Sequence, residues 1–223
     1  MTMTLDPQQR RRAMKNVSAN DERGPVLAYY GKTLYTSYPL LLIVGREYNG
    51  SGSVTGEMGE YNFTESWGSS FWNRAYSFAS RCHSRTTRLK KDCVQSGCSP
   101  IVFSNALPLR IPNHRSAKEK RAQRLKVPQD AIERYIRLLF HQPLIPRVRG
   151  AVLSGLDDPE VFDSAVALIQ SECEGRQIRV IRLPYFAARY SDEIFDEKLP
   201  EQDRAVVQEI IKAFYRSCFE KGA

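Results

Sequence analysis

The segment Pro-Leu-Leu-Leu-Ile-Val-Gly-Arg-Glu-Tyr-Asn-Gly, residues 39–50, decides the fold. Its first half is apolar at every position instead of at alternate positions, which is typical of a strand buried on both faces in a parallel sheet. The run stops at Gly45, and charged and amide side chains follow at once. Because parallel sheets bind ligands beyond the carboxyl ends of their strands, we expect Glu47 and its neighbours to form part of a binding site.

Three further segments have the composition of buried strands, and helical patterns separate them. A short amphipathic helix is expected before the first strand, within residues 21–38. Strands that alternate with helices form parallel β-α units with right-handed crossovers. The sequence therefore predicts an α/β fold, a three-layer α/β/α domain with a central parallel sheet of about four strands. The expected strands are residues 40–44, 99–105, 150–154 and 178–183, and the expected helices begin near residues 70, 128, 158 and 201.

The chain of 223 residues is long enough for one sizeable α/β domain and short for two. We expect a flexible basic arm at residues 1–20 and a single domain at residues 21–223. No apolar stretch approaches the roughly 20 residues of a membrane helix, and the N-terminus lacks the apolar core of a secretory signal. These features predict a cytoplasmic, monomeric protein without membrane association.

Cysteine usage gives no support for a disulfide framework, because the five cysteines are odd in number and no secretory signal is visible. Cys82, His83, Cys93 and Cys98 lie close enough in sequence to suggest a zinc site. No Cys-x-x-Cys pair is present, however, and the spacing from Cys93 to Cys98 is loose. We therefore expect reduced structural thiols, no metal and no cofactor.

The charge of the chain favours an anionic partner, since the formal net charge is +8 and the pI is near 9.3. Basic residues cluster at residues 10–15 and again at residues 110–126, where only Glu119 offsets them. One basic run is often a solvated face, but two runs in a basic chain indicate nucleic acid. The basic residues of the second run are Arg110, Arg115, Lys118, Lys120, Arg121, Arg124 and Lys126.

The four predicted strand ends would bring an acid, an amide, a tight glycine turn and an aromatic loop to one edge of the sheet. In this order and approximate spacing, residues 39–192 resemble the uracil-DNA glycosylase superfamily. The resemblance implies that Gly-Arg-Glu-Tyr-Asn, residues 45–49, carries the residue that handles water. It also implies that Asn105, in Val-Phe-Ser-Asn-Ala, reads a base flipped out of the DNA.

The same resemblance implies roles for two further segments. An aromatic residue at the start of the helix near residue 70 would stack on the base, and residues 183–189 would clamp phosphate and insert into the duplex. The implied catalytic residues are Glu47 and Asn49, and the implied base-binding residues are Gly45, Arg46, Tyr48, Phe71, Trp72 and Asn105. The basic run adds Arg110, Arg115, Lys118 and Arg121 as DNA-binding residues, beside Pro184, Tyr185, Phe186 and Arg189 of the last loop.

Hydrolysis of an N-glycosidic bond calls for these residue types. Positive charge develops on the sugar and negative charge on the departing base, so a carboxylate such as Glu47 can stabilise the sugar cation and orient a water. The amide of Asn105 offers a donor and an acceptor to a pyrimidine edge. Flipping a base costs a few kcal/mol, which an aromatic pocket wall can offset.

Three departures from the superfamily pattern bear on the substrate. Glu47 stands where aspartate or asparagine is usual, Tyr48 replaces a proline, and Leu183 occupies the place of the histidine that activates the base. We therefore expect a divergent glycosylase that acts on a modified or damaged base. Repair and defence against modified phage DNA are both open as its purpose.

Two other functions fit parts of the pattern. The same fold could bind nucleic acid without catalysis. The glycines at positions 50, 52 and 56 could instead belong to a nucleotide-cofactor site, but no Lys-Ser/Thr follows them as in a phosphate-binding loop. A dinucleotide fold also requires an acidic residue at the end of the second strand, where this chain has Asn105.

Overall fold

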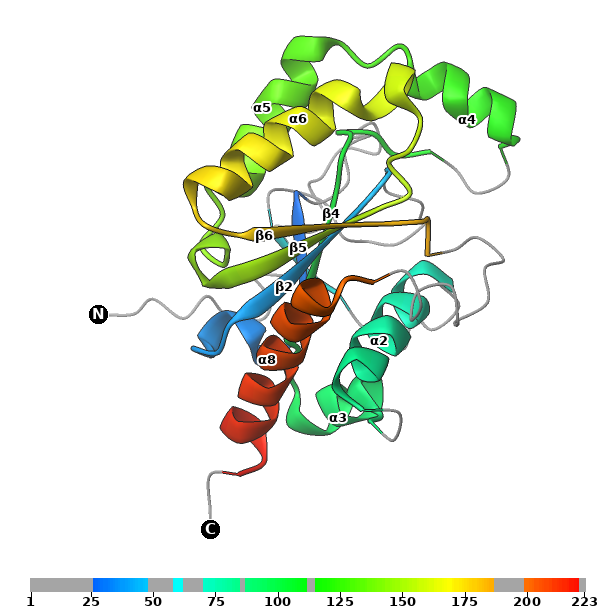
Figure 1. The fold of residues 1–223 in the computed structure, drawn as a ribbon. Coiled ribbons are helices and arrows are strands. Elements are labelled where there is room, and N and C mark those ends of the chain that lie inside the picture. Colours follow the sequence, from blue (N-terminus) through cyan, green and yellow to red (C-terminus); the bar gives the residue numbers. More distant parts are fainter. Residues whose placement is uncertain are drawn as a thin grey trace, which may run out of the picture.

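The computed structural model describes residues 26–47, 58–61, 70–84, 87–111, 115–186 and 199–220. Within these ranges six strands form one sheet in the order β3-β1-β4-β2-β5-β6. Figure 1 shows the sheet edge-on between two layers of helices. In chain order the strands are β1 (Leu27–Tyr30), β2 (Leu40–Gly45), β3 (Met58–Tyr61), β4 (Ile101–Asn105), β5 (Val148–Ser154) and β6 (Arg179–Leu183).

The four strands expected from the sequence are confirmed as β2, β4, β5 and β6, and they pair in parallel with one another. The whole sheet is nevertheless mixed, because β1 runs antiparallel to β4 and carries β3 parallel to itself. Without β1, the backbone groups along the outer edge of β4 would lack partners. The Ser104 hydroxyl, on β4, reinforces this pairing by donating to the Val26 carbonyl at 2.6 Å.

The expectation of a helix before β2 is wrong for the described residues. Residues 27–30 form β1, and only a short 3₁₀ turn, η1 (Lys32–Tyr35), follows. Two tyrosines in this strand are residues that favour a pleated surface. At Gly31, φ is +51°, and a Cβ atom would lie 2.2 Å from the Gly97 carbonyl oxygen, so glycine is required where the chain turns.

Helices cover both faces of the sheet, which makes the domain three-layered (Figure 1). One face carries α2 (Ser70–His83), α3 (Leu89–Ser96) and α8 (Glu201–Cys218). The other carries α5 (Gln129–Phe140) and α6 (Pro159–Gly175), and α4 (Ala117–Arg124) lies beyond them, toward the carboxyl ends of the strands. A 3₁₀ turn, η2 (Ile145–Arg147), leads into β5. None of the helices that the structure describes has the length and apolar character needed to cross a membrane.

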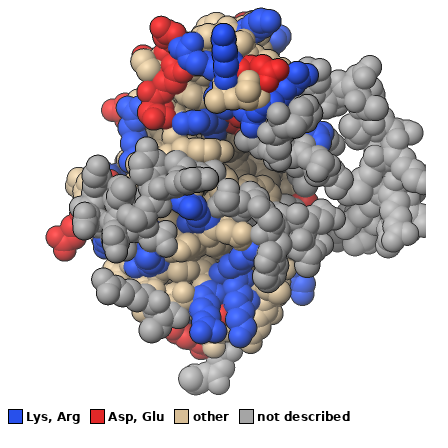
Figure 2. All heavy atoms as spheres, turned by 90° about the vertical axis from the view of Figure 1, so that its right-hand side faces the viewer, with Lys and Arg blue, Asp and Glu red and all other residues tan. Residues whose placement is uncertain are grey.

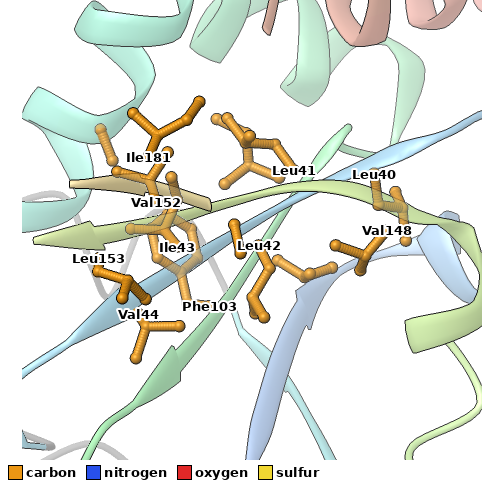
Figure 3. Close-up of a cluster of buried hydrophobic side chains, with 14 of the residues drawn as sticks. Leu40, Leu41, Leu42, Ile43, Val44, Phe103, Val148, Val152, Leu153 and Ile181 are labelled. Carbon is orange, nitrogen blue, oxygen red and sulfur yellow. The ribbon is translucent and has the colours of Figure 1, made fainter. Parts of the chain in front are cut away.

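The centre of the core is β2, whose side chains from Leu40 to Val44 are fully buried. Figure 3 shows them packed against Phe103 of β4, Val148, Val152 and Leu153 of β5, and Ile181 of β6. The uninterrupted apolar run in the sequence is explained by this burial on both faces. Each such aliphatic side chain contributes roughly 1.5–3 kcal/mol by leaving water.

The connections that leave β2 and β4 go to opposite faces of the sheet. Between β2 and β4 the chain forms β3 at the edge of the sheet and then α2 and α3 on one face. Between β4 and β5 it forms α4 and α5 on the other face, and β5 then pairs with the far side of β2. Neighbouring parallel strands whose connections diverge in this way form the usual ligand site of an open α/β sheet. The fold thereby singles out the carboxyl ends of β2 and β4.

Arg147 fastens the segment that leads into β2, and this gives a test of the fold. Its guanidinium donates to the Thr33 carbonyl at 2.9 Å, to the Thr36 hydroxyl at 2.6 Å and to the Tyr38 carbonyl at 3.0 Å. Arg147→Met keeps most of the apolar stem but leaves these acceptors without their donor, and should lower the free energy of unfolding by about 2–3 kcal/mol in urea titrations.

Arg149→Met is the matched control, because Arg149 is exposed and its hydrogen bonds to described residues go to the nearby carbonyls of Pro146 and Val148. It should change stability by less than about 0.5 kcal/mol. Equal losses for the two variants would show that the bonds of Arg147 do not hold this segment.

Candidate functional site

Glu47 lies two residues beyond the end of β2, beneath the last residue of α4. The guanidinium of Arg124 donates to both carboxylate oxygens, with Nε–Oε2 at 2.8 Å and Nη2–Oε1 at 2.6 Å. This is the bidentate geometry in which arginine binds carboxylates most strongly. The side chain of Glu47 is only 1% exposed and that of Arg124 11%. The acid predicted to be catalytic is therefore covered by a cation.

Asn105 ends β4 directly opposite Gly45 of β2 in the parallel register. When its side-chain amide is oriented with the nitrogen inward, Asn105 donates to two backbone carbonyl oxygens, that of Ser104 at 3.2 Å and that of Glu47 at 3.3 Å. Tyr135 of α5 forms hydrogen bonds with Ser104 and Asn105. Burial raises the pKa of Tyr135 to about 12, although these hydrogen bonds lower it. The structure thus places Glu47 and Asn105 at the same edge, on neighbouring strand ends.

Arg46 links the ends of β2, β5 and β6. Its Nε donates to the Gly155 carbonyl at 2.7 Å, its Nη2 lies 3.3 Å from the Asp157 carboxylate, and its guanidinium carbon lies 4.4 Å from the centre of the Tyr185 ring. The last contact has cation–π geometry. The side chain remains 27% exposed at the strand edge, beside the exposed carboxylate of Asp157.

Gly155 makes this arrangement possible. Its φ is +71°, and a Cβ atom there would lie 2.4 Å from the Cβ of Tyr185. Its N–H donates to the Leu183 carbonyl at 2.9 Å, and the hydroxyl of Ser154 accepts from the Phe186 N–H at 2.9 Å. The turn after β5 therefore holds the loop after β6 in place.

Phe71 of α2 lies against the end of β2. A Cβ on Gly45 would lie 3.0 Å from its ring, so the glycine at the end of β2 lets the ring approach. The ring of Tyr185 lies 5.6 Å from that of Phe71, centre to centre. Trp72, the other predicted stacking residue, is parallel to Phe103 of β4 at 4.7 Å, so that face of its indole is already occupied.

The loop after β6 differs in part from the expected DNA-binding loop. Pro184 and Tyr185 are half-buried, but Phe186 is fully buried against Phe71 and Phe78, and therefore packs in the core instead of facing DNA. Leu183 is buried as well, so the position at which the resemblance expects a histidine supplies an apolar core side chain. Tyr48, Asn49 and Arg189 lie outside the described residues.

The basic segment after β4 is partly neutralised by acids. Arg115, which precedes α4, lies 3.4 Å from Glu119 of that helix. Arg121 lies 2.8 Å from Asp158 and also contacts Glu160, and Lys118 is exposed. Asp158 occupies the N-cap position of α6, as expected, but caps nothing with its side chain, because its carboxylate binds Arg121. The hydrogen bond from Arg121 lowers the pKa of Asp158.

Positive charge nevertheless extends over the side of the molecule toward which the parallel strands point. Figure 2 shows Lys and Arg side chains gathered at the top of this side, over α4, with Asp and Glu beside them, and again in its lower part. Arg110, which follows β4, is half-buried.

The predicted thiols are all unbridged, and the zinc grouping suggested by the sequence is not formed. Cys98 lies with its sulfur 3.5 Å from that of Cys218, far along the chain. Within the described ranges, no three His, Cys, Asp or Glu side chains lie close enough together to hold a metal ion.

Two residues of the site escaped the sequence reasoning. Arg124 was visible only as one of several basic residues, and Tyr135 only as part of the apolar stripe of a helix. No local pattern pairs either of them with Glu47 or Asn105, since both contacts join segments that are distant in the sequence.

Replacing Gly155 tests whether this edge is as tightly built as the geometry indicates. Gly155→Ala forces a side chain into positive φ and into the space of Tyr185, and should cost about 1–3 kcal/mol of stability in urea titrations. Gly175→Ala, at the end of α6 in open space, is the control and should stabilise by about 0.4–1 kcal/mol. If Gly155→Ala leaves the free energy of unfolding unchanged, the loop that carries Tyr185 is not packed tightly against Gly155.

Comparison of the chain with models of known protein families and with curated proteins returns no match.

Proposed function

We propose that the protein is a DNA glycosylase with a uracil-DNA glycosylase-like fold, which flips a modified or damaged base out of DNA and hydrolyses its N-glycosidic bond. One observation carries the proposal. Glu47 and Asn105, the acid and amide that the chemistry requires, meet at the carboxyl ends of β2 and β4, where the connections diverge. The abasic site left in the DNA would be the product.

The residues around this pair suit the charges of the reaction. The carboxylate of Glu47 would stabilise the positive charge that develops on the sugar and orient the attacking water. Asn105 would read the base edge, and Phe71 would flank it with an aromatic ring. Arg46, cationic and partly exposed beside Gly155, would offset the negative charge of the departing base in place of the histidine expected at Leu183.

A non-catalytic nucleic-acid-binding module is the second candidate, and the cover over Glu47 favours it. A carboxylate that is 1% exposed and bound on both oxygens by Arg124 cannot orient a water while that pair persists. The two candidates share their partner, DNA, and differ in whether a base is released.

Base release is the decisive measurement. Duplex and single-stranded DNAs that carry a panel of modified bases would be incubated with the protein, and free bases identified by mass spectrometry. We expect at least one base to be released, and Glu47→Gln to lower the rate by about 10²–10³-fold, because the neutral amide cannot balance the sugar cation.

Glu172→Gln is the matched control. Glu172 also pairs with an arginine, Arg176, but it belongs to α6 and is far along the chain from the ends of β2 and β4. It should release bases at the wild-type rate. If wild type releases none of the bases yet binds DNA with a steep salt dependence, the protein is a binding module. Thermal stabilisation by a dinucleotide would instead support the cofactor site.

Phosphate contacts by the α4 segment can be tested apart from catalysis. Lys118→Gln should weaken binding to all sequences alike and reduce the slope of log K against log salt by about 1, measured by fluorescence anisotropy. Lys212→Gln, on α8, is the control and should leave the slope unchanged. An unchanged slope for Lys118→Gln would place the DNA elsewhere on the surface.

A further inference from the structure

The attachment of α4 differs from that of the other helices. None of its residues is buried, and within the described ranges the hydrogen bonds that join it to other elements come from two arginines, Arg121 and Arg124. Its first turn is completed locally, since Ser116 and Glu119 form a reciprocal capping box. The helix is therefore self-contained and is attached to the domain mainly by charge.

The two arginines bind different acids with different exposure. Arg121 reaches Asp158 and Glu160 at the start of α6, and its side chain is 43% exposed, so solvent ions screen these pairs. Arg124 and Glu47 are almost completely covered, so their pair is screened far less. The Arg121 pairs would break first, and the Arg124 pair would decide whether the helix stays in place.

A guanidinium binds phosphate with the same two-pronged geometry with which it binds carboxylate. Lys118 and Lys126, on the same segment, are exposed. A chain of phosphates along this segment would meet the exposed lysines first and could then compete with the carboxylates for the two arginines.

We infer that α4 is a phosphate-responsive cover over Glu47. Backbone phosphates of a nucleic acid draw Arg121 and Arg124 away from their carboxylates, α4 shifts, and the carboxylate of Glu47 becomes open to the flipped nucleotide. What Glu47 then acts on rests on the proposed function, but the displacement of α4 by a polyanion does not.

This exchange explains how a covered acid can still serve as a catalytic group. Without nucleic acid, Arg124 neutralises the carboxylate of Glu47 and excludes water from it. With nucleic acid, several phosphates replace the carboxylates as partners of Arg121 and Arg124. The carboxylate of Glu47 then faces water and sugar instead of Arg124. A single free phosphate lacks the multivalency that would shift both arginines.

The distance between α4 and α6 reports on the cover directly. Spin labels on Ala122→Cys and Ala167→Cys, both exposed positions, would be introduced in a Cys218→Ser background, and the distance distribution measured by pulsed electron resonance. An unmodified 20-base-pair duplex, tripolyphosphate, and sodium chloride of equal ionic strength would be compared. We expect a second distance to rise from below about 10% to above about 50% of molecules with the duplex and not with sodium chloride.

Variants separate the two arginines. Arg124→Gln should populate the second distance without DNA, and Arg121→Gln should lower the duplex concentration needed to reach it. Arg134→Gln is the control, because the ion pair that Arg134 makes with the described part of the chain joins it to the exposed Asp130 of its own helix, α5. It should behave as wild type. If tripolyphosphate raises the population of the second distance as much as the duplex does, any polyphosphate displaces α4, and the restriction of the cover to nucleic acid is wrong.

A single, unchanged distance with the duplex bound, as verified by anisotropy, would overturn the cover. The proposed function fails separately. If α4 shifts and no base is released, the inference about α4 is supported and the glycosylase proposal is wrong. If bases are released while α4 remains in place, the glycosylase proposal is supported and the inference about α4 is wrong.

Discussion

The burial of β2 on both faces is the constraint on which the rest of the structure depends. Five consecutive aliphatic side chains, residues 40–44, can leave water only if parallel strands flank them and helices cover both sides. The helices between β2 and β4, α2 and α3, supply one layer, and the helices between β4 and β5, α4 and α5, belong to the other. The divergence of these two connections is what creates a site at the strand ends.

The same burial imposes a cost on the site. Glu47 follows the buried strand so closely that its carboxylate is removed from solvent, and an unpaired charge at such a position would be strongly destabilising. Arg124 compensates with two hydrogen bonds, and Arg46 next to Glu47 is held by Gly155, Asp157 and Tyr185. The site is therefore a set of mutually satisfied charges, and any chemistry there requires that part of this set be rearranged.

Much of the fold follows from local pattern. The four parallel strands and the helices α2, α5, α6 and α8 were expected close to their observed bounds, because uninterrupted apolar runs and helical stripes reflect burial directly. The expectation failed at β1, where aliphatic and tyrosine side chains between Val26 and Tyr35 were interpreted as the apolar stripe of an amphipathic helix. What made this segment a strand was the open edge of β4, which is a property of the assembled sheet.

The sequence by itself determined that an acid and an amide follow two parallel strands, since apolar runs mark the strands and chain direction puts their ends at one edge of the sheet; the structure made these two strands neighbours. Only the tertiary structure decided that Arg124 covers the acid of residues 39–50, that Phe186 and Leu183 are core side chains, and that Tyr135 supports Asn105. These contacts join residues dozens of positions apart. Nothing in a linear pattern specifies them, because they arise from the packing of helices against a sheet that must already exist.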